Sequence, residues 1–234
     1  MNQVPDHSQV MADYYAAFRP LIDAEDKRRC VSFALSALSS GKLDIPSLYE
    51  GVLAPAAREL QCTLRQRRLC VWEEHVRTSI LRTVIECCYP ELMKARDLIA
   101  GDQTRGPGII VCPTEEYHEL GARMAADLFT LQGFDTVFVG ANTPQQDILD
   151  AVTVIHPVFV GVSVTSPYNL VPARRVIQQM MQLRTDIGAS FRIIAGGQAF
   201  GTDVGRAKYL GADLLAQDYA QIQRFAQELP WSSH

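Results

Sequence analysis

The chain has 234 residues and a formal net charge of -4 at pH 7, with 47% hydrophobic and 21% charged residues. This composition is typical of a folded globular protein, and the acidic balance opposes direct binding to nucleic acid, which depends on basic surfaces. No apolar run approaches the roughly 20 residues needed to cross a bilayer, and the N-terminus has no secretory pattern. We therefore expect a cytoplasmic protein without a membrane segment.

The cysteines form no Cys-x-x-Cys pair of the kind that holds a metal. A cytosolic chain of this size does not depend on a disulfide framework. The sequence therefore predicts buried or free thiols at Cys30, Cys62, Cys70, Cys87, Cys88 and Cys112.

The first part of the chain, from about residue 8 to 100, is predicted to be helical. Four helices are expected, with breaks near Asp23-Ala24, Gly41-Lys42 and Leu64-Arg65 and an end at Tyr89-Pro90. The third helix has Asp44 as its expected N-cap, Pro46 in its first turn, and one apolar stripe made of Ile45, Leu48, Val52, Leu53, Ala56 and Leu60.

The fourth helix places a histidine among apolar residues on one face. The members of that face are Val71, His75, Thr78, Leu81 and Ile85. Helical spacing therefore predicts that His75 looks inward.

The polar, glycine-rich segment 101–107 separates the helical region from a second pattern, so we expect domains over 8–100 and 106–230. Apolar runs at 108–112, 136–139, 158–164, 191–195 and 214–216 alternate with helical segments at 119–132, 144–155, 169–186 and 202–210 and a last helix through about 229. Such alternation predicts a Rossmann-like (flavodoxin-like) parallel sheet covered on both faces. Residues 230–234 are expected to be a frayed tail.

The stretch from Glu116 to Gly121 lies between the first predicted strand and the helix after it, which is the ligand-binding edge of an open parallel sheet. A neutral imidazole at His118 is a good ligand for cobalt, iron or zinc, and Glu116 could accept the proton of its other ring nitrogen. Side chains two residues apart meet only in a turn. The alternative from these residues alone is a surface histidine beside acidic residues.

Two further strand ends carry small residues. Ser163 and Thr165 end one strand with hydroxyl groups, and Gly196-Gly197 ends another where a ligand or chain can approach the backbone closely. In a parallel sheet these ends lie at the same edge as His118.

The order Glu-x-His-x-x-Gly, Ser-x-Thr and Gly-Gly resembles the cobalamin-binding Rossmann-like domain of corrinoid proteins. The resemblance implies that His118 is the lower axial ligand of cobalt and that the serine and glycine motifs line a groove for the nucleotide tail. Corrinoid enzymes usually carry aspartate at the first position, whereas Glu116 is similar to the light-sensing cobalamin regulators of the CarH and LitR type.

Those regulators also place a four-helix bundle over the corrin, and Glu74-His75 resembles the Glu-His pair of their last bundle helix. The resemblance implies that His75 approaches cobalt from above after photolysis. The chain departs from the pattern at Leu64, where the family has a tryptophan beside the adenosyl group, and Trp72 is not a positional substitute.

An arginine cluster follows Leu64 and leaves two interpretations open. Arg65, Arg67 and Arg68 could pair with the propionates of a bilin or heme, or they begin a solvated basic helix. Bilin and heme therefore stay alternatives to cobalamin.

The resemblance implies a cobalamin photoreceptor that is not an enzyme, holds adenosyl- or methylcobalamin, and regulates transcription through a protein partner, as the stand-alone AerR and PpaA proteins do. One alternative is a corrinoid carrier protein of a methyltransferase system, and another is a scaffold that holds no cofactor. A homo-oligomer is compatible with each of these functions.

Overall fold

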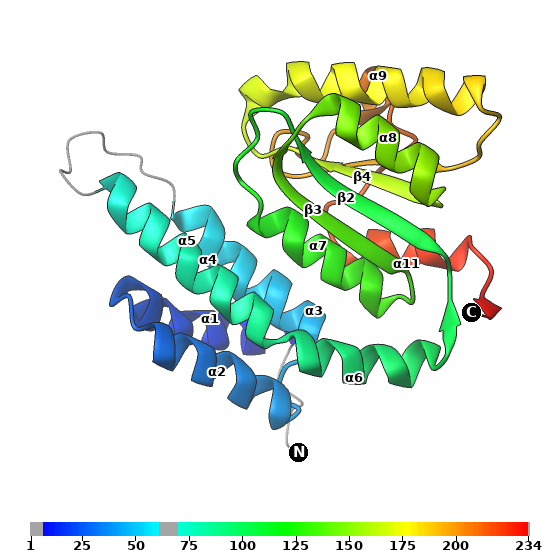
Figure 1. The fold of residues 1–234 in the computed structure, drawn as a ribbon. Coiled ribbons are helices and arrows are strands. Elements are labelled where there is room, and N and C mark those ends of the chain that lie inside the picture. Colours follow the sequence, from blue (N-terminus) through cyan, green and yellow to red (C-terminus); the bar gives the residue numbers. More distant parts are fainter. Residues whose placement is uncertain (1–6, 61–69, 234) are drawn as a thin grey trace. The chain divides into compact units, whose positions relative to one another are not determined.

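The computed structural model describes residues 7–60 and 70–233 (Figure 1). The chain divides into two compact units, a helical unit over Met1–Lys94 and a sheet unit over Ala95–His234. The domain limits of 8–100 and 106–230 stay a prediction, because the division by contacts falls inside a helix.

The helical unit begins with α1 (His7–Asp23) and α2 (Lys27–Ser39). A continuous helical run follows, made of α3 (Ile45–Leu48), the π-helical turn η1 (Tyr49–Leu53) and α4 (Ala54–Glu59). The helices α5 (Cys70–Cys87) and α6 (Tyr89–Ala100) follow the residues that are not described. The expected count of four helices did not include α6.

Local sequence signals account for several of these helices. The Asp44 carboxylate accepts a 2.8 Å hydrogen bond from Ser47 N, which confirms the predicted N-cap, and Asp26 caps α2 in the same way. The predicted stripe is buried at Ile45, Leu48, Val52, Leu53 and Ala56. Gly51 lets α1 approach closely, since a Cβ there would lie 2.7 Å from the Met11 sulfur.

The cysteine prediction is confirmed in part. Cys30, Cys87, Cys88 and Cys112 are not in a disulfide, and burial raises the pKa of Cys30 to about 11. Cys62 lies outside the described residues. Cys70 is disulfide-bonded, so the prediction of a free thiol is wrong at that position.

The sheet unit contains a five-stranded parallel sheet, as predicted. Its strands in spatial order are β3 (Asp135–Thr143), β2 (Pro107–Pro113), β4 (Phe159–Ser163), β5 (Arg192–Gly196) and β6 (Leu214–Leu215). The chain leaves β2 toward β3 and then crosses to β4 on the other side. The point where the connections diverge therefore lies between the carboxyl ends of β2 and β4, where open α/β sheets bind ligands.

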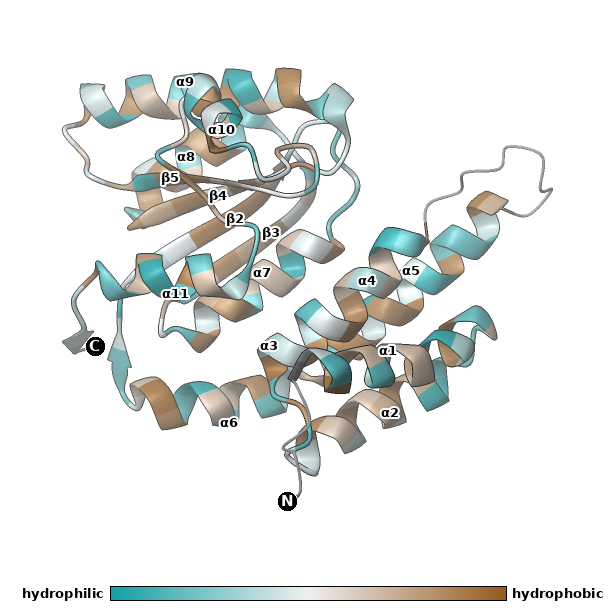
Figure 2. Cartoon of the chain, turned by 180° about the vertical axis from the view of Figure 1, so that it is seen from behind, coloured by the Kyte–Doolittle hydropathy of each residue, from teal (hydrophilic) through white to brown (hydrophobic). Residues whose placement is uncertain are grey.

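Helices cover both faces of this sheet. Figure 1 shows α7 (Leu120–Leu131) and α11 (Tyr219–Gln227) on one face and α8 (Gln145–Ile155) and α9 (Leu170–Asp186) on the other, where α10 (Val204–Leu210) packs against α9. Apolar residues concentrate in the strands, while the helices alternate between apolar and polar faces (Figure 2). The buried face under α8, α9 and α10 is rich in valine and isoleucine, as expected of parallel strands.

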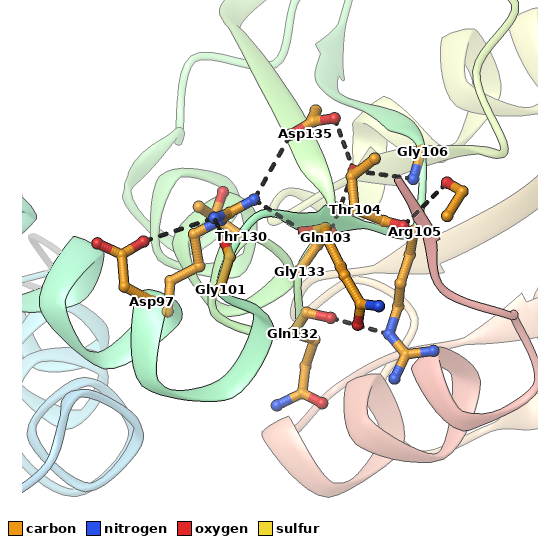
Figure 3. A network of polar contacts seen from close by, with 12 residues as sticks. Asp97, Gly101, Gln103, Thr104, Arg105, Gly106, Thr130, Gln132, Gly133 and Asp135 are labelled. Atoms are coloured by element: carbon orange, nitrogen blue, oxygen red, sulfur yellow. Dashed lines mark hydrogen bonds and ion pairs between the residues drawn. The ribbon is translucent and has the colours of Figure 1, made fainter. Parts of the chain in front are cut away.

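The segment between α6 and β2 is bonded into the sheet unit (Figure 3). The Thr104 hydroxyl donates to Asp135 Oδ2 at 2.6 Å and accepts from Gly106 N at 3.0 Å. Arg96 Nη1 donates to the Gly101 carbonyl at 3.0 Å, so the end of α6 is tied to the same network. The polar joint predicted from sequence is therefore ordered.

The prediction of a frayed tail is wrong for residues 231–233. The strand β7 (Ser232–Ser233) pairs antiparallel with β1 (Gln103–Thr104), and the Arg105 guanidinium lies 3.8 Å from the centre of the Trp231 ring. An aromatic ring stacked on a cation and a short ladder hold this end of the chain. Within residues 7–60 and 70–233, no helix has the length and apolar character required to cross a membrane.

Candidate functional site

The loop between β2 and α7, residues 114–119, is held against the end of β3 by four hydrogen bonds, one of them from the Thr114 hydroxyl to the Thr143 carbonyl at 3.3 Å. Glu115 adopts a left-handed conformation (φ 70°), and its N–H donates to Asn142 Oδ1 at 2.8 Å. Asn142 N in turn donates to the Glu116 carbonyl at 2.8 Å, and Ala141 N donates to Glu119 Oε2 at 3.0 Å. The conformation of the loop is therefore fixed by bonds to its own sheet.

This turn brings Glu116 and His118 together as the sequence predicted. Glu116 is fully buried, and its Oε1 accepts hydrogen bonds from His118 N at 2.9 Å and from His118 Nδ1 at 2.7 Å. The imidazole itself is half exposed, at 50%. With the carboxylate at Nδ1, Nε2 is the nitrogen through which this ring would coordinate a metal.

The second carboxylate oxygen of Glu116 is held from β4 and the turn after it. Thr165 N and Ser166 N donate to Oε2 at 2.9 and 3.0 Å, and Asn169 Nδ2 donates at 3.1 Å. Asn169 is buried and also donates to the Glu115 carbonyl at 3.1 Å. One carboxylate thus ties the β2 loop to the β4 loop at the point where the connections diverge.

Burial raises the pKa of Glu116, but the hydrogen bonds from His118, Ser166 and Asn169 outweigh burial and lower its pKa to about 2. The group is therefore an anion at neutral pH and keeps His118 Nδ1 as a hydrogen-bond donor. This arrangement fixes both the tautomer and the orientation of the ring.

The serine and glycine motifs lie at the same edge of the sheet. Ser163 ends β4, and Val164 N donates to the Gly196 carbonyl at 2.9 Å, which joins that strand end to β5. Gly197 has φ +94°, and a Cβ there would lie 2.4 Å from the Val164 carbonyl oxygen. Only glycine fits this close approach between the two strand ends.

Gly121 differs from Gly197, because a Cβ added to it would meet nothing within 4 Å. It is exposed in the first turn of α7, three residues after His118. Packing among the described residues does not require a glycine here, so its small size is available to a group that approaches the His118 side of the loop.

Three of the site residues predicted in the helical unit, Trp72, Glu74 and His75, lie in the first half of α5. Trp72 is 66% exposed, and His75 is exposed as well, so the inward orientation predicted for His75 is wrong within this unit. The same face is buried only further along, at Leu81 and Ile85. Glu74 is half buried, and Leu64 lies outside the described residues, as does the arginine cluster.

Within residues 7–60 and 70–233, no three or more His, Cys, Asp or Glu side chains gather as a metal site. A cofactor that brings its metal already held needs only one ligand from the protein. A single imidazole oriented by a buried carboxylate meets that requirement.

Comparison with known proteins agrees with this geometry. Residues 106–221 match the family model described as the B12 binding domain. No curated protein matches the chain by sequence.

Among solved structures, the monomethylamine corrinoid protein of Methanosarcina barkeri matches with a TM-score of 0.75 at 15% identity, over 92% of this chain and 98% of that one. A cobalamin-binding protein of Desulfitobacterium hafniense has a TM-score of 0.47 at 16% identity, over 91% and 96% of the two chains. The methanol:cobalamin methyltransferase complex of Methanosarcina barkeri has a TM-score of 0.47 at 15% identity, over 97% and 85%.

At this identity the first of these likenesses establishes the fold, and the family model identifies the domain. Residues 106–221 belong to the B12 binding domain family, and the sheet unit is accordingly a cobalamin-binding domain.

Proposed function

We propose that His118 is the lower axial ligand of cobalt in a corrinoid that this chain binds, and that Glu116 orients it. The observation that carries this proposal is the 2.7 Å hydrogen bond between His118 Nδ1 and the fully buried carboxylate of Glu116. A carboxylate at Nδ1 raises the basicity of the imidazole and directs Nε2 toward the metal.

The other motifs supply the rest of the site. Ser163, Thr165, Gly196 and Gly197 line the groove for the nucleotide tail, and Gly121 leaves room for the corrin above the loop. When bound, cobalamin supplies a cobalt centre that holds and releases an alkyl group. The chain supplies an axial ligand and fixes its orientation.

We propose further that the chain is a corrinoid carrier of a methyltransferase system, with methylcobalamin as its loaded form and a methyltransferase as its protein partner. Its support is the fold shared with the monomethylamine corrinoid protein across 92% of the chain, both units included. In this function the chain is not itself a catalyst, because the transfer is catalysed by the partner.

The second candidate is a light sensor that holds adenosyl- or methylcobalamin and signals through a protein partner such as a transcription regulator. It is favoured by the exposed His75 next to Glu74 on α5, which leaves His75 accessible to a cofactor. In that function His75 would become a cobalt ligand after light removes the upper alkyl group. Heme or bilin in place of cobalamin stays a variant of the same sensor.

The binding proposal is tested by mixing the purified protein with methylcobalamin, removing free cofactor by gel filtration, and recording the absorption spectrum. We expect one retained corrin per chain, with a spectrum in which the protein has displaced the cofactor's own benzimidazole. His118→Ala should lose that spectrum. The control is His156→Asn, which changes an exposed histidine whose left-handed conformation (φ 50°) asparagine tolerates. Unchanged binding in His118→Ala would refute the axial role.

Illumination distinguishes the two candidate functions. A carrier transfers its methyl group in the dark to a thiol or folate acceptor when the partner is present, and His75→Ala leaves that transfer intact. A sensor changes its spectrum and its partner affinity on illumination, and His75→Ala abolishes the light-induced spectrum. Light-dependent partner binding without dark transfer would replace the carrier by the sensor.

A further inference from the structure

The start of α9 and the facing part of α10 expose a group of large side chains, which we call the α9 patch. It consists of Tyr168, Val171, Arg174, Arg175 and Tyr209. Tyr168 is 89% exposed, Tyr209 73% and Val171 59%. Aromatic and arginine residues are the types enriched in the centres of protein interfaces. The composition therefore favours contact with another protein.

The two arginines of the patch carry charge that the described part of the chain does not neutralise. The Arg174 guanidinium lies 5.2 Å from the centre of the Tyr209 ring, and neither Arg174 nor Arg175 has an ion pair with a described residue. The whole chain, by contrast, has a net charge of -4. Among the described residues, Glu115 is the one carboxylate that lines a cavity together with Arg175, so with Arg174 the patch keeps a net positive charge, which favours an acidic partner.

This cavity opens beside the patch and has a volume of about 370 Å³. Its lining includes Tyr168, Val171 and Arg175 of the patch, the loop residues Thr114 and Glu115, and the buried Ile148. An aliphatic side chain would contact Ile148 while a carboxylate beside it meets the Arg175 guanidinium.

We infer that the α9 patch is a docking surface for a partner protein segment that presents a carboxylate next to an aliphatic side chain. The patch extends from the cavity to Tyr209 on a second helix, so a stretch of chain matches it better than one small anion does. This inference rests on the proposed function, because that function requires a partner protein.

The position of the surface connects it to the cobalamin site. Tyr168 lies in the 3₁₀ turn η2 (Pro167–Asn169), and the next residue, Asn169, donates to Glu116 Oε2 at 3.1 Å. Glu115, which also lines the cavity, precedes Glu116 directly. A partner docked here therefore contacts both loops that position Glu116, the carboxylate bonded to the proposed axial ligand His118.

The test is a selection of peptides from a phage-displayed random library on the full-length protein without cobalamin. We expect enriched peptides with Asp or Glu next to Leu, Ile or Val, and we measure their Kd by fluorescence anisotropy. The double variant Arg174→Glu, Arg175→Glu should weaken binding at least tenfold, and Tyr168→Ala severalfold. Arg192→Glu, an exposed arginine at the start of β5, is the matched control and should leave the Kd unchanged.

Three results would overturn the inference: no peptide enriched above background, enriched peptides without an acidic consensus, or equal binding to the double variant. Displacement of the peptide by succinate at matched concentration would assign the cavity to a small carboxylate instead. Circular dichroism verifies that the double variant is folded. Cobalamin retention is measured separately, so a protein that binds peptide but no corrin refutes the proposed function and leaves the docking surface standing.

Discussion

The chain contains two Glu/His pairs, Glu116–His118 and Glu74–His75, and their surroundings in the structure differ. Glu116 in the sheet unit is fully buried with five hydrogen bonds, two from His118 and three from the β4 loop. Glu74 and His75 lie in the first half of α5, where Glu74 is half buried and His75 is exposed. Residue type alone therefore does not make a ligand site. What distinguishes His118 is a buried carboxylate that accepts from its N–H and Nδ1 through one oxygen, while donors of the β4 loop hold the other oxygen.

Removal of the Glu116 carboxylate should give the largest effect. In Glu116→Ala the donors at His118, Thr165, Ser166 and Asn169 lose their acceptor inside the protein. We expect the free energy of unfolding of the sheet unit to fall by about 3–5 kcal/mol. The matched variant Glu74→Ala should change it by no more than about 0.5 kcal/mol.

Urea unfolding in a Trp72→Phe background measures this difference, because Trp231 is then the sole tryptophan and reports on the sheet unit. Equal losses in the two alanine variants would remove the distinction between the pairs.

Acid should act on the sheet unit through the same carboxylate. The pKa of Glu116 is about 2 in the folded chain, against an ordinary value of 4.5. Because the folded pKa is depressed, the stabilisation is complete above about pH 4.5 and is lost as the pH falls toward 2. Between pH 6 and pH 3 this one group should cost about 2 kcal/mol.

The comparison that isolates this effect is Glu116→Gln, which cannot titrate at that position. The free energy of unfolding of the cofactor-free protein should fall more steeply in the wild type than in this variant over that range. Parallel curves would show that the low pKa does not contribute to stability.

Asn169 should matter less than Glu116 but more than an ordinary surface amide. Asn169→Ala removes one of the five donors to the carboxylate and the bond to the Glu115 carbonyl. We expect a loss of about 1.5 kcal/mol, the usual value for a hydrogen bond to a charged group. Gln178→Ala, an exposed amide on α9, serves as the control and should stay within about 0.5 kcal/mol. A loss in Asn169→Ala no larger than in the control would show that the other four donors suffice.

The sequence predicted the sheet well because its strands are short apolar runs with polar or glycine-rich ends. It missed the last part of β3, residues 140–143, where Gly140 and Asn142 have positive φ and the register with β2 shifts. Irregular backbone of this kind leaves no alternating pattern to read. It also missed the pairing of the C-terminal residues with β1, which depends on contacts more than 100 residues apart in the chain.

The site was predicted where a motif is local and missed where it depends on topology. Glu116 and His118 are two residues apart, whereas Asn169 reaches Glu116 across 53 residues. Its only signal was a polar amide shortly after the Ser163 strand end. His75 was misplaced because helical spacing identifies a face but not how far along the helix another element covers it.

Gly121→Ala should give the smallest change in stability and the sharpest separation between folding and binding. The added methyl group meets no atom of the chain within 4 Å, and alanine favours helix, so the free energy of unfolding should stay equal or rise by at most about 1 kcal/mol. If the space beside Gly121 belongs to the corrin, the same methyl group should weaken methylcobalamin binding about tenfold, or about 1.4 kcal/mol. Isothermal titration and urea unfolding on one preparation compare the two effects. A variant that binds cobalamin as well as the wild type would place the corrin away from the first turn of α7 and leave the Glu116–His118 pair as the sole feature that locates it.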